Sequence, residues 1–484
     1  MMELTAGQRR FLGLAREGEN IFLSGGAGTG KTLALQEAVF ELRLGGKNVI
    51  VCAATGAAAA LCGGSTLHRL FNLKNGIGID EQRREPVVHA GRVLELADVI
   101  VIDEISMVRM DIFDSVAASL SAAQKKTGRR IQLIAAGDFH QLRPVINDRR
   151  RERERLAACY GRDIGSGYAF QSDSWKGMGF KSVVLDQVRR QLDPAFVEKL
   201  LGIRSGDASA LRFFRENSSA RPFVDGLYLC PTNKQADQIN GMKLKEIQGP
   251  SRIYRARAAG HILASDKVVP DEIELKAGAR ATIVVNDPFG RFFNGSTGIV
   301  TDLLDDGVLI RLDGHAESTE VPFWTWRINE YVVDRHGVLA AKEIGSYSQL
   351  PLRLAYALTI HRSQGATYSK VNLNPSCWEC GQLYVALSRV RSIADLFLTQ
   401  ELKDEYLRVD REVIDFYGSL GKQEAEAGQA AKKASPGRPS AYGRKTRTMR
   451  VPVEMADSIR KALEEWAGDP ENKRIVCISS QNPG

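Results

Sequence analysis

The stretch "IFLSGGAGTGKT", residues 21–32, decides the fold class of this chain. Between Gly25 and Thr32 the spacing of glycine, lysine and threonine fits the phosphate-binding loop G-x-x-x-x-G-K-[ST]. In such a loop a buried strand leads into the turn and a helix follows, so that backbone N–H groups and the helix dipole face phosphate oxygens. Lys31 is expected to neutralise the β- and γ-phosphates of ATP, and the Thr32 hydroxyl to hold Mg²⁺. The residues of this loop predicted to contact the nucleotide are Gly25, Gly26, Ala27, Gly28, Thr29, Gly30, Lys31 and Thr32.

Three further apolar runs follow the loop and predict parallel strands. They read "NVIVCAA" at residues 48–54, "DVIVID" at 98–103 and "IQLIAAGD" at 131–138, and each is separated from the next by enough chain for a crossover helix. The middle run ends in Asp103 and Glu104, which places two carboxylates at the carboxyl edge of the sheet, where such folds bind ligands. We predict that Asp103 holds Mg²⁺, directly or through water, and that Glu104 activates and orients the attacking water.

The rest of the chain predicts a second α/β layer and an all-β insert. The segment "GLYLCPTNKQADQIN" (226–240) indicates a strand followed by a helix, and "VNLN" (371–374) indicates another strand. Between them, residues 275–314 carry short β-branched runs separated by Gly, Asn and Asp, and the "DDG" at 305–307 is a hairpin signal. After about Gly421 the chain is poor in apolar residues and rich in Ala, Gly and basic side chains, which predicts a flexible linker with a positive tail.

Length and composition limit the number of domains, the location and the kinds of partner that can be expected. The 484 residues exceed what one hydrophobic core usually serves, so two or more domains are expected. No apolar run approaches the roughly 20 residues needed to cross a bilayer, and the first residues lack the apolar core of a secretion signal, so we expect no membrane partner and a cytoplasmic location. The net charge of +8 and the pI of about 9.0 favour polyanionic partners such as nucleic acid. The seven cysteines make no disulfide framework, and Cys377 and Cys380 in "CWEC" have no second pair to complete a zinc site.

Several further motifs resemble those of one helicase family. A phosphate loop with an acidic strand end serves kinases, transporters, GTPases and motors alike, so residues elsewhere must discriminate. The further motifs read "ATGAAAALCGGSTLHRLF" at 54–71, "AAGDFHQLRPV" at 135–145, "AYALTIHRSQGAT" at 355–367 and "GQLYVALSRVRS" at 381–392. In this order, together with "DEISMV" at 103–108, they are similar to the motifs of the Pif-type (petite integration frequency) DNA helicases, in the RecD-like branch of superfamily one. The resemblance extends from Leu4 to about Leu398.

The resemblance implies nucleotide contacts outside the phosphate loop. Gln8 matches the glutamine that recognises adenine, and Gln141 matches the glutamine that senses the γ-phosphate and couples it to DNA. Arg190 and Arg389 match arginines that reach the γ-phosphate from the second α/β domain, where a planar guanidinium suits charge spread over phosphate oxygens. Gly365 completes the nucleotide contacts that the resemblance implies.

The resemblance also implies a path for single-stranded DNA across both α/β domains. Single strands are held by phosphate contacts and by stacking of bases on aromatic faces. Taken alone, His68 or Phe71 would more often be a core residue, but the surrounding "TLHRLF" favours contact with DNA. Arg189 replaces an aromatic residue common in the family, and Arg391 is expected to be structural or near DNA. The residues that match DNA contacts are Thr55, Thr66, His68 and Phe71 in the first domain and His361, Ser363 and Thr367 in the second.

The expected architecture is α/β, with two RecA-like P-loop domains, a small inserted SH3-like all-β module and a flexible basic C-terminal tail. The first domain is expected at residues 1–175, with a small wedge insert at about 72–92. The remaining expected bounds are 176–265 and 345–420 for the second domain, 266–344 for the module and 421–484 for the tail.

These features together predict an ATP-dependent DNA helicase that uses ATP and Mg²⁺. The resemblance implies translocation along single-stranded DNA in the 5′-to-3′ direction, coupled to duplex unwinding in replication, repair or recombination. The expected partners are single-stranded DNA, tailed or forked duplex DNA, and partner proteins at replication or recombination sites. The chain is expected to be a monomer, associated with the nucleoid if its source is bacterial. Two alternatives stay open: a DNA-stimulated ATPase that remodels nucleoprotein complexes without unwinding, and a RecD-like subunit of a helicase–nuclease complex.

Overall fold

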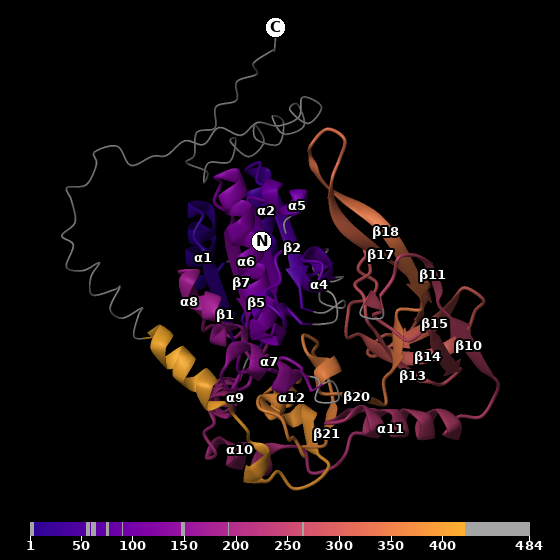
Figure 1. Ribbon diagram of the computed structural model, residues 1–484. Coiled ribbons are helices and arrows are strands. Elements are labelled where there is room, and N and C mark those ends of the chain that lie inside the picture. Colours follow the sequence, from indigo (N-terminus) through magenta and orange to yellow (C-terminus); the bar gives the residue numbers. More distant parts are fainter. Residues whose placement is uncertain are drawn as a thin grey trace, which may run out of the picture. The chain divides into compact units, whose positions relative to one another are not determined.

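The first α/β domain is built on a six-stranded sheet (Figure 1). The structure is a computed structural model that describes residues 4–54, 59, 64–73, 77–89, 91–146, 151–191, 193–263 and 266–421. The sheet order is β3-β2-β6-β7-β1-β8, and every neighbouring pair is parallel. The four apolar runs in the first third of the chain all form strands of this sheet, as predicted. Its strands are β1 (Ile21–Gly25), β2 (Val49–Ala53), β3 (Ser65–Thr66), β6 (Val99–Asp103), β7 (Gln132–Gly137) and β8 (Lys181–Leu185).

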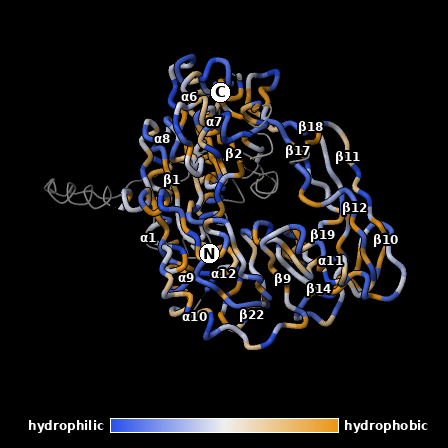
Figure 2. The backbone as a smooth tube through the Cα atoms, turned by 60° about the horizontal axis from the view of Figure 1, so that its bottom comes forward, coloured by the Kyte–Doolittle hydropathy of each residue, from blue (hydrophilic) through white to orange (hydrophobic). Residues whose placement is uncertain are grey.

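Helices cover both faces of this sheet, which is why its strands read as continuous apolar runs. The helices are α1 (Ala6–Glu17), α2 (Lys31–Leu44), α4 (Leu67–Leu70), α5 (Arg92–Leu96), α6 (Met110–Thr127), α7 (Glu152–Tyr160) and α8 (Asp173–Gly177). Successive side chains of β1 alternate between the faces. Ile21 and Leu23 share a core with α1 and α2, whereas Phe22 shares another core with α6. Figure 2 colours much of these strands as hydrophobic and the connecting loops largely as hydrophilic.

A pair of short strands lies within the predicted wedge insert. β4 (Ile79–Asp80) and β5 (Glu85–Pro86) pair in antiparallel fashion. Glu81, which follows β4, accepts hydrogen bonds from two nitrogens of Arg155 on α7, at 2.5 and 2.7 Å. This small hairpin is therefore tied to a helix of the first domain.

The second α/β domain carries a four-stranded parallel sheet of order β20-β9-β21-β22. Its strands are β9 (Leu227–Cys230), β20 (Ala357–Thr359), β21 (Val371–Leu373) and β22 (Leu396–Leu398). Its helices are α9 (Pro194–Ser205), α10 (Ala210–Asn217), α11 (Asn233–Glu246) and α12 (Gln382–Leu387). The domain begins later than predicted. The expected boundary after residue 175 is too early because β8 pairs with β1 and so belongs to the first sheet.

An all-β module interrupts the second domain, as predicted. Its antiparallel sheets have the orders β16-β15-β14-β13-β19, β11-β18-β17 and β10-β12. The predicted hairpin at 305–307 is confirmed, since β14 pairs with β15 across it. The SH3-like description stays a prediction. The strands are β10 (Ser251–Arg255), β11 (Arg257–Gly260), β12 (Glu272–Lys276), β13 (Arg280–Ile283), β14 (Thr297–Leu303), β15 (Gly307–Leu312), β16 (Ser318–Pro322), β17 (Trp324–Val333), β18 (Leu339–Gln349) and β19 (Leu352–Leu354).

The module is wider than the expected residues 266–344, because it starts at β10 and ends at β19. β11 is exposed along its whole length, so its sequence carries no apolar signal and its order comes from pairing with β18. The long hairpin of β17 and β18 contacts the first domain, where the Val51 N–H donates to the Tyr331 hydroxyl at 3.3 Å. Near the start of the module, Asp266 accepts a hydrogen bond from Arg69 of α4 at 2.6 Å.

The last described segment also returns to the first domain. Residues 411–421 form a helix whose Val413 and Leu420 are buried in the first-domain core. The expected bounds 345–420 for the second domain are therefore wrong at their end, because this helix packs on the other α/β domain. The predicted tail at 422–484 lies outside the described residues. In the described part of the chain, no helix has the length and apolar character needed to cross a membrane.

Candidate nucleotide and DNA sites

The phosphate-binding loop folds around its own lysine. Lys31 Nζ donates to the Gly25 carbonyl at 2.7 Å and to the Gly26 carbonyl at 3.1 Å. Gly30 precedes α2 with φ of 83°, a left-handed conformation that glycine adopts without the strain a Cβ would cause. Burial lowers the pKa of Lys31. The ammonium group therefore occupies an enclosed cradle at a helix N-terminus, where phosphate oxygens can replace the two carbonyls.

Gln8 and Arg190 both lie against this loop, and their contacts with a nucleotide stay predictions. Gln8 is fully buried, and its Nε2 donates to the Gly30 carbonyl at 3.3 Å. Thr5 holds Gln8 in place, because the Thr5 N–H donates to Gln8 Oε1 at 2.9 Å in a capping box at the start of α1. A Cβ at Gly28 would lie 2.5 Å from the Cβ of Arg190. The glycine thus allows a residue of the second domain to approach the loop.

The two acids at the end of β6 adopt a strained arrangement. Glu104 has φ of 53° and ψ of 46°, in the left-handed region, and its N–H donates to Asp103 Oδ1 at 2.8 Å. Burial raises the pKa of Glu104 to about 7, and the Asp103 charge adds to the shift. Burial likewise raises the pKa of Asp103. Glu104 is therefore poised to take a proton near neutral pH, as a general base requires.

Gln364 of the second domain joins Glu104 to the predicted sensor Gln141. Its Nε2 lies 3.2 Å from Glu104 Oε2 and 3.2 Å from Gln141 Oε1, and it donates to both. Gln364 is not among the predicted site residues, because nothing but its place in the quoted motif "HRSQGAT" distinguishes it in the sequence. It is a direct polar contact between the second domain and the predicted hydrolytic groups.

Asp138 holds the sensor loop from the other direction. Gln141 Nε2 donates to Asp138 Oδ2 at 3.3 Å, and Arg204 of α9 donates to Asp138 Oδ1 at 2.8 Å. Burial alone would raise the pKa of Asp138, but the positive charges around it, that of Arg204 foremost, together outweigh burial and hold this pKa at about 2. Sequence reasoning missed Arg204, whose partner lies 66 residues away in the chain. A buried ion pair therefore links the second domain to the loop that carries Gln141.

The two predicted γ-phosphate arginines are held by carbonyl groups of their own domain. Arg389 is 1% exposed, and its guanidinium donates to the carbonyls of Ser363 and Ala366 at 3.0 and 3.1 Å. Burial lowers the pKa of Arg389 to about 9, with Arg190 adding to the shift. Arg190 donates to the Gly365 carbonyl at 3.2 Å. Their reach to a γ-phosphate stays a prediction. Both arginines would have to exchange these carbonyls for phosphate oxygens.

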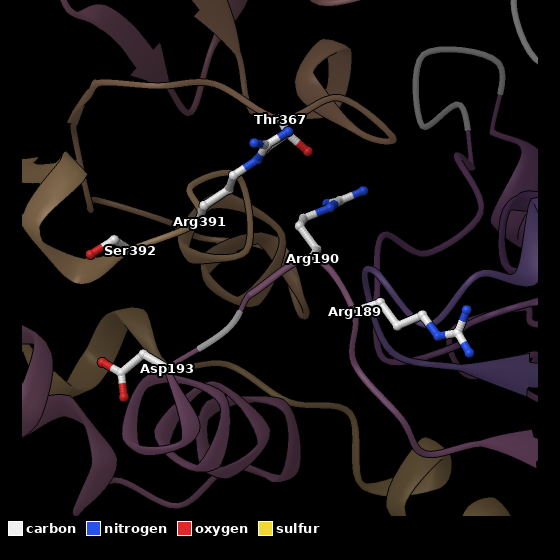
Figure 3. Close-up of a pocket in the computed structure, with 6 residues that line it drawn as sticks. All are labelled: Arg189, Arg190, Asp193, Thr367, Arg391 and Ser392. Carbon is white, nitrogen blue, oxygen red and sulfur yellow. The ribbon is translucent and has the colours of Figure 1, made fainter. Parts of the chain in front are cut away.

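A pocket of about 680 Å³ lies beside Arg190 (Figure 3). Figure 3 shows Arg391 extending toward Thr367, with Arg190 beside them and Arg189 pointing away. Arg391, expected to be structural or near DNA, thus lines a basic pocket next to a predicted γ-phosphate arginine. The lining residues are Arg189, Arg190, Asp193, Thr367, Arg391 and Ser392.

Known proteins share this arrangement of domains. The sequence profile of the PIF1-like helicase family matches residues 4–210. The chain is 33% identical to the ATP-dependent DNA helicase Pif1 of Bdellovibrio bacteriovorus, over 86% of this chain and 92% of that protein. The chain belongs to the Pif1 helicase family. Among solved structures it is similar to Bacteroides sp Pif1 in complex with ADP-AlF4, with a TM-score of 0.76 and 31% identity over 87% of this chain and 98% of that one. It is also similar to Bacteroides Pif1 bound to ssDNA, with a TM-score of 0.62 and 31% identity over 88% and 98%.

Three residues predicted to contact DNA on the Pif1 pattern keep partly exposed side chains. They are His68, His361 and Thr367. His361 Nε2 lies 3.0 Å from Glu379 Oε2, which fixes the ring. Thr66 is 5% exposed, and its hydroxyl caps α4 by accepting from the Arg69 N–H at 3.3 Å. Contact with DNA stays a prediction for these four residues. Thr55 lies outside the described residues.

Two predicted DNA contacts need correction. Phe71 is 0% exposed and belongs to the first-domain core, so its ring cannot stack on a base. It is the residue that caps the C-terminus of α4. Ser363 is also 0% exposed, and its hydroxyl donates to the Ile360 carbonyl at 2.7 Å. Both side chains are therefore packing groups of their domains.

The described residues hold no group of three or more His, Cys, Asp and Glu side chains arranged for a metal ion. Cys377 is buried and Cys380 is partly buried, and both are free thiols. Burial raises the pKa of Cys377 to about 12. These two cysteines therefore behave as packed side chains of the second domain.

Proposed function

We propose that this ATP-dependent DNA helicase translocates along single-stranded DNA in the 5′-to-3′ direction by opening and closing its two α/β domains around the phosphate loop. The observation that carries the proposal is the Gln364 amide, which reaches both Glu104 and Gln141 from the second domain. A group that touches the base and the sensor together can transmit the loss of the γ-phosphate to the part of the chain that holds the second grip on DNA.

The residues of the site fit a magnesium nucleotide. The Thr32 hydroxyl and the Asp103 carboxylate are hard oxygen donors of the kind that Mg²⁺ binds, and the ion when bound would neutralise phosphate charge. Lys31 already sits in an anion cradle and would exchange its carbonyl partners for phosphate oxygens. Glu104 would hold the attacking water and take its proton. Arg389 would exchange its carbonyl partners for phosphate oxygens and clamp the charge that develops on them.

Single-stranded DNA is proposed to run past His68 in the first domain and past His361 and Thr367 in the second. These partly exposed side chains match Pif-type motif positions by resemblance, and the net charge of +8 favours a polyanion. Tailed and forked duplexes are the proposed substrates for unwinding.

A strand-displacement assay on duplexes with a 5′ or a 3′ single-stranded tail tests activity and polarity together. We expect ATP-dependent unwinding from the 5′ tail only, with DNA-stimulated ATP hydrolysis measured alongside. Lys31→Ala is the control, because it removes the phosphate contact and should abolish hydrolysis and unwinding together. Unwinding only from the 3′ tail would overturn the proposed direction. Stimulated hydrolysis without strand separation would favour a nucleoprotein-remodelling ATPase instead.

A further inference from the structure

The helix at residues 411–421, drawn in yellow in Figure 1, is the last described element of the chain. It packs on the first α/β domain, although it follows the second in sequence. Val413 and Leu420 lie in the first-domain core at 1% and 8% exposure. The ring of Phe416 stacks on Phe170, with centroids 4.3 Å apart. The helix is thus a fixed part of the first-domain core.

Tyr417 on this helix makes polar contacts that apolar packing does not require. Its hydroxyl lies 2.5 Å from Ser24 Oγ and accepts a hydrogen bond from the Phe139 N–H at 3.2 Å. Ser24 immediately precedes the phosphate-binding loop, and Phe139 immediately follows Asp138. Burial raises the pKa of Tyr417, so the hydroxyl stays protonated and can donate to Ser24 while it accepts from Phe139.

The ring of Tyr417 also contacts groups of both domains. It stacks on the imidazole of His140, with centroids 4.6 Å apart and an interplanar angle of 21°. Burial lowers the pKa of His140 to about 4, with Arg204 adding to the shift, so the stacked imidazole is neutral at physiological pH. The Arg204 guanidinium lies 5.2 Å from the centroid of the Tyr417 ring, a cation–π distance. Arg204 is the residue that pairs with Asp138.

From these contacts we propose that Tyr417 is a positioning residue for ATP hydrolysis. It holds the loop of residues 138–141 against the end of β1. The loop in turn keeps the Gln141 side chain next to Gln364 and Glu104. The inference rests on the proposed role of Gln141 as the γ-phosphate sensor. Without the hydroxyl, the buried Phe139 N–H loses its partner, and the loop must shift to find another. Arg204 of the second domain contacts both the Tyr417 ring and Asp138. A movement of the second domain is therefore transmitted to the loop through both of these contacts.

The test compares Tyr417→Phe with Tyr254→Phe in the full chain. Tyr417→Phe removes the two hydroxyl contacts and keeps the ring. Tyr254 is a matched control, because it is a buried tyrosine of the all-β module whose hydroxyl donates to the Leu304 carbonyl at 2.9 Å. Both variants lose one buried hydroxyl and should show similar falls in melting temperature, which measures the purely structural effect.

The kinetic readouts separate positioning from stability. Loss of a neutral hydrogen bond changes an equilibrium or rate by about fivefold, so we expect Tyr417→Phe to lower DNA-stimulated kcat by about that factor. The KM for ATP should change by less than about twofold, because nucleotide contacts are kept. The ATP consumed per base pair unwound should rise in Tyr417→Phe and stay at the wild-type value in Tyr254→Phe.

Ser24→Ala tests the same hydroxyl from its other side, and it serves as the second variant if Tyr417→Phe does not fold. We expect Ser24→Ala to lower kcat in the same direction, and the double variant to be no slower than the slower single variant, because both remove one contact. Additive effects of the two substitutions would overturn the inference.

Gln141→Ala distinguishes failure of this inference from failure of the proposed function. If Gln141→Ala is impaired while Tyr417→Phe keeps the wild-type kcat and ATP consumption per base pair, the positioning role of Tyr417 is wrong and the sensor role stands. If Gln141→Ala itself turns over ATP like the wild type, the sensor role is wrong and the inference that rests on it is overturned too.

Discussion

Replacing Arg204 with methionine is expected to destabilise the protein at neutral pH and to change the sign of a pH dependence. The Arg204 guanidinium lies 2.8 Å from Asp138 Oδ1, and the two side chains are 16% and 0% exposed. Removing one partner of such a buried pair leaves the other charge unpaired, which costs about 3–5 kcal/mol. Arg204→Met keeps much of the apolar volume of the side chain, so the lost charge is the main change.

The pH dependence follows from the pKa of Asp138. In the wild type this pKa is about 2, below the ordinary value of 3.8. The ionised carboxylate therefore contributes about 2 kcal/mol of stability above the ordinary pKa, and this contribution is lost as the pH falls through the folded pKa. In Arg204→Met burial dominates and raises the pKa of Asp138 above its ordinary value. The variant should then gain stability as the pH falls from neutral toward that raised pKa.

Urea unfolding of the full chain at about pH 8 and about pH 5 measures both effects. Arg204→Met with Asp138→Asn should recover about half or more of the lost stability at the higher pH, because no unpaired charge remains. Arg212→Met is the matched control, since its ion pair with Glu216 on α10 is 80% and 56% exposed and should matter little. If Arg204→Met is as stable as Arg212→Met and has the wild-type pH dependence, the buried pair does not hold the loop as described.

Two further predictions concern the chemistry of hydrolysis. The pKa of Glu104 is raised to about 7, and only its ionised carboxylate can accept a proton. We therefore expect kcat/KM for ATP to rise from about pH 6 to about pH 8 with a midpoint near 7. A midpoint near the ordinary glutamate pKa of 4.5 would show that another group is the base. Arg389→Ala should still bind ATP but hydrolyse it about 10³-fold more slowly, as for other arginines that clamp a transferred phosphoryl group. Wild-type turnover by that variant, with ATP binding followed by a fluorescent analogue, would show that Arg389 does not reach the γ-phosphate.

The sequence was enough to predict those elements of the fold that depend only on residues near one another in the chain. The phosphate loop needs glycine at fixed positions, and buried parallel strands need continuous apolar runs, so β1 and β6 could be predicted with the acids that follow. The hairpin at 305–307 was likewise fixed by its turn residues.

Long-range packing decided what the sequence could not show. β8 joins the first sheet by pairing with a strand about 160 positions earlier, and no feature of its own sequence states which sheet it enters. Phe71 was expected to contact DNA because it lies in the motif "TLHRLF". Its side chain is instead buried in the hydrophobic core, which membership of a motif does not exclude. Gln364 and Arg204 acquire their roles only from partners on the other α/β domain.

The coupling between the two domains is tested most directly by the ATP consumed per base pair unwound by Gln364→Ala. This substitution removes the amide that donates to both Glu104 and Gln141. Gln400→Ala is the control, because Gln400 is an exposed glutamine of the second domain whose amide bonds only Asn374 among the contacts described for it. Gln364→Ala is predicted to bind ATP, to lose most of its stimulation by DNA and to consume more ATP per base pair than Gln400→Ala. Equal stimulation and equal ATP consumption in the two variants would contradict the claim that the second domain is coupled to hydrolysis through this contact.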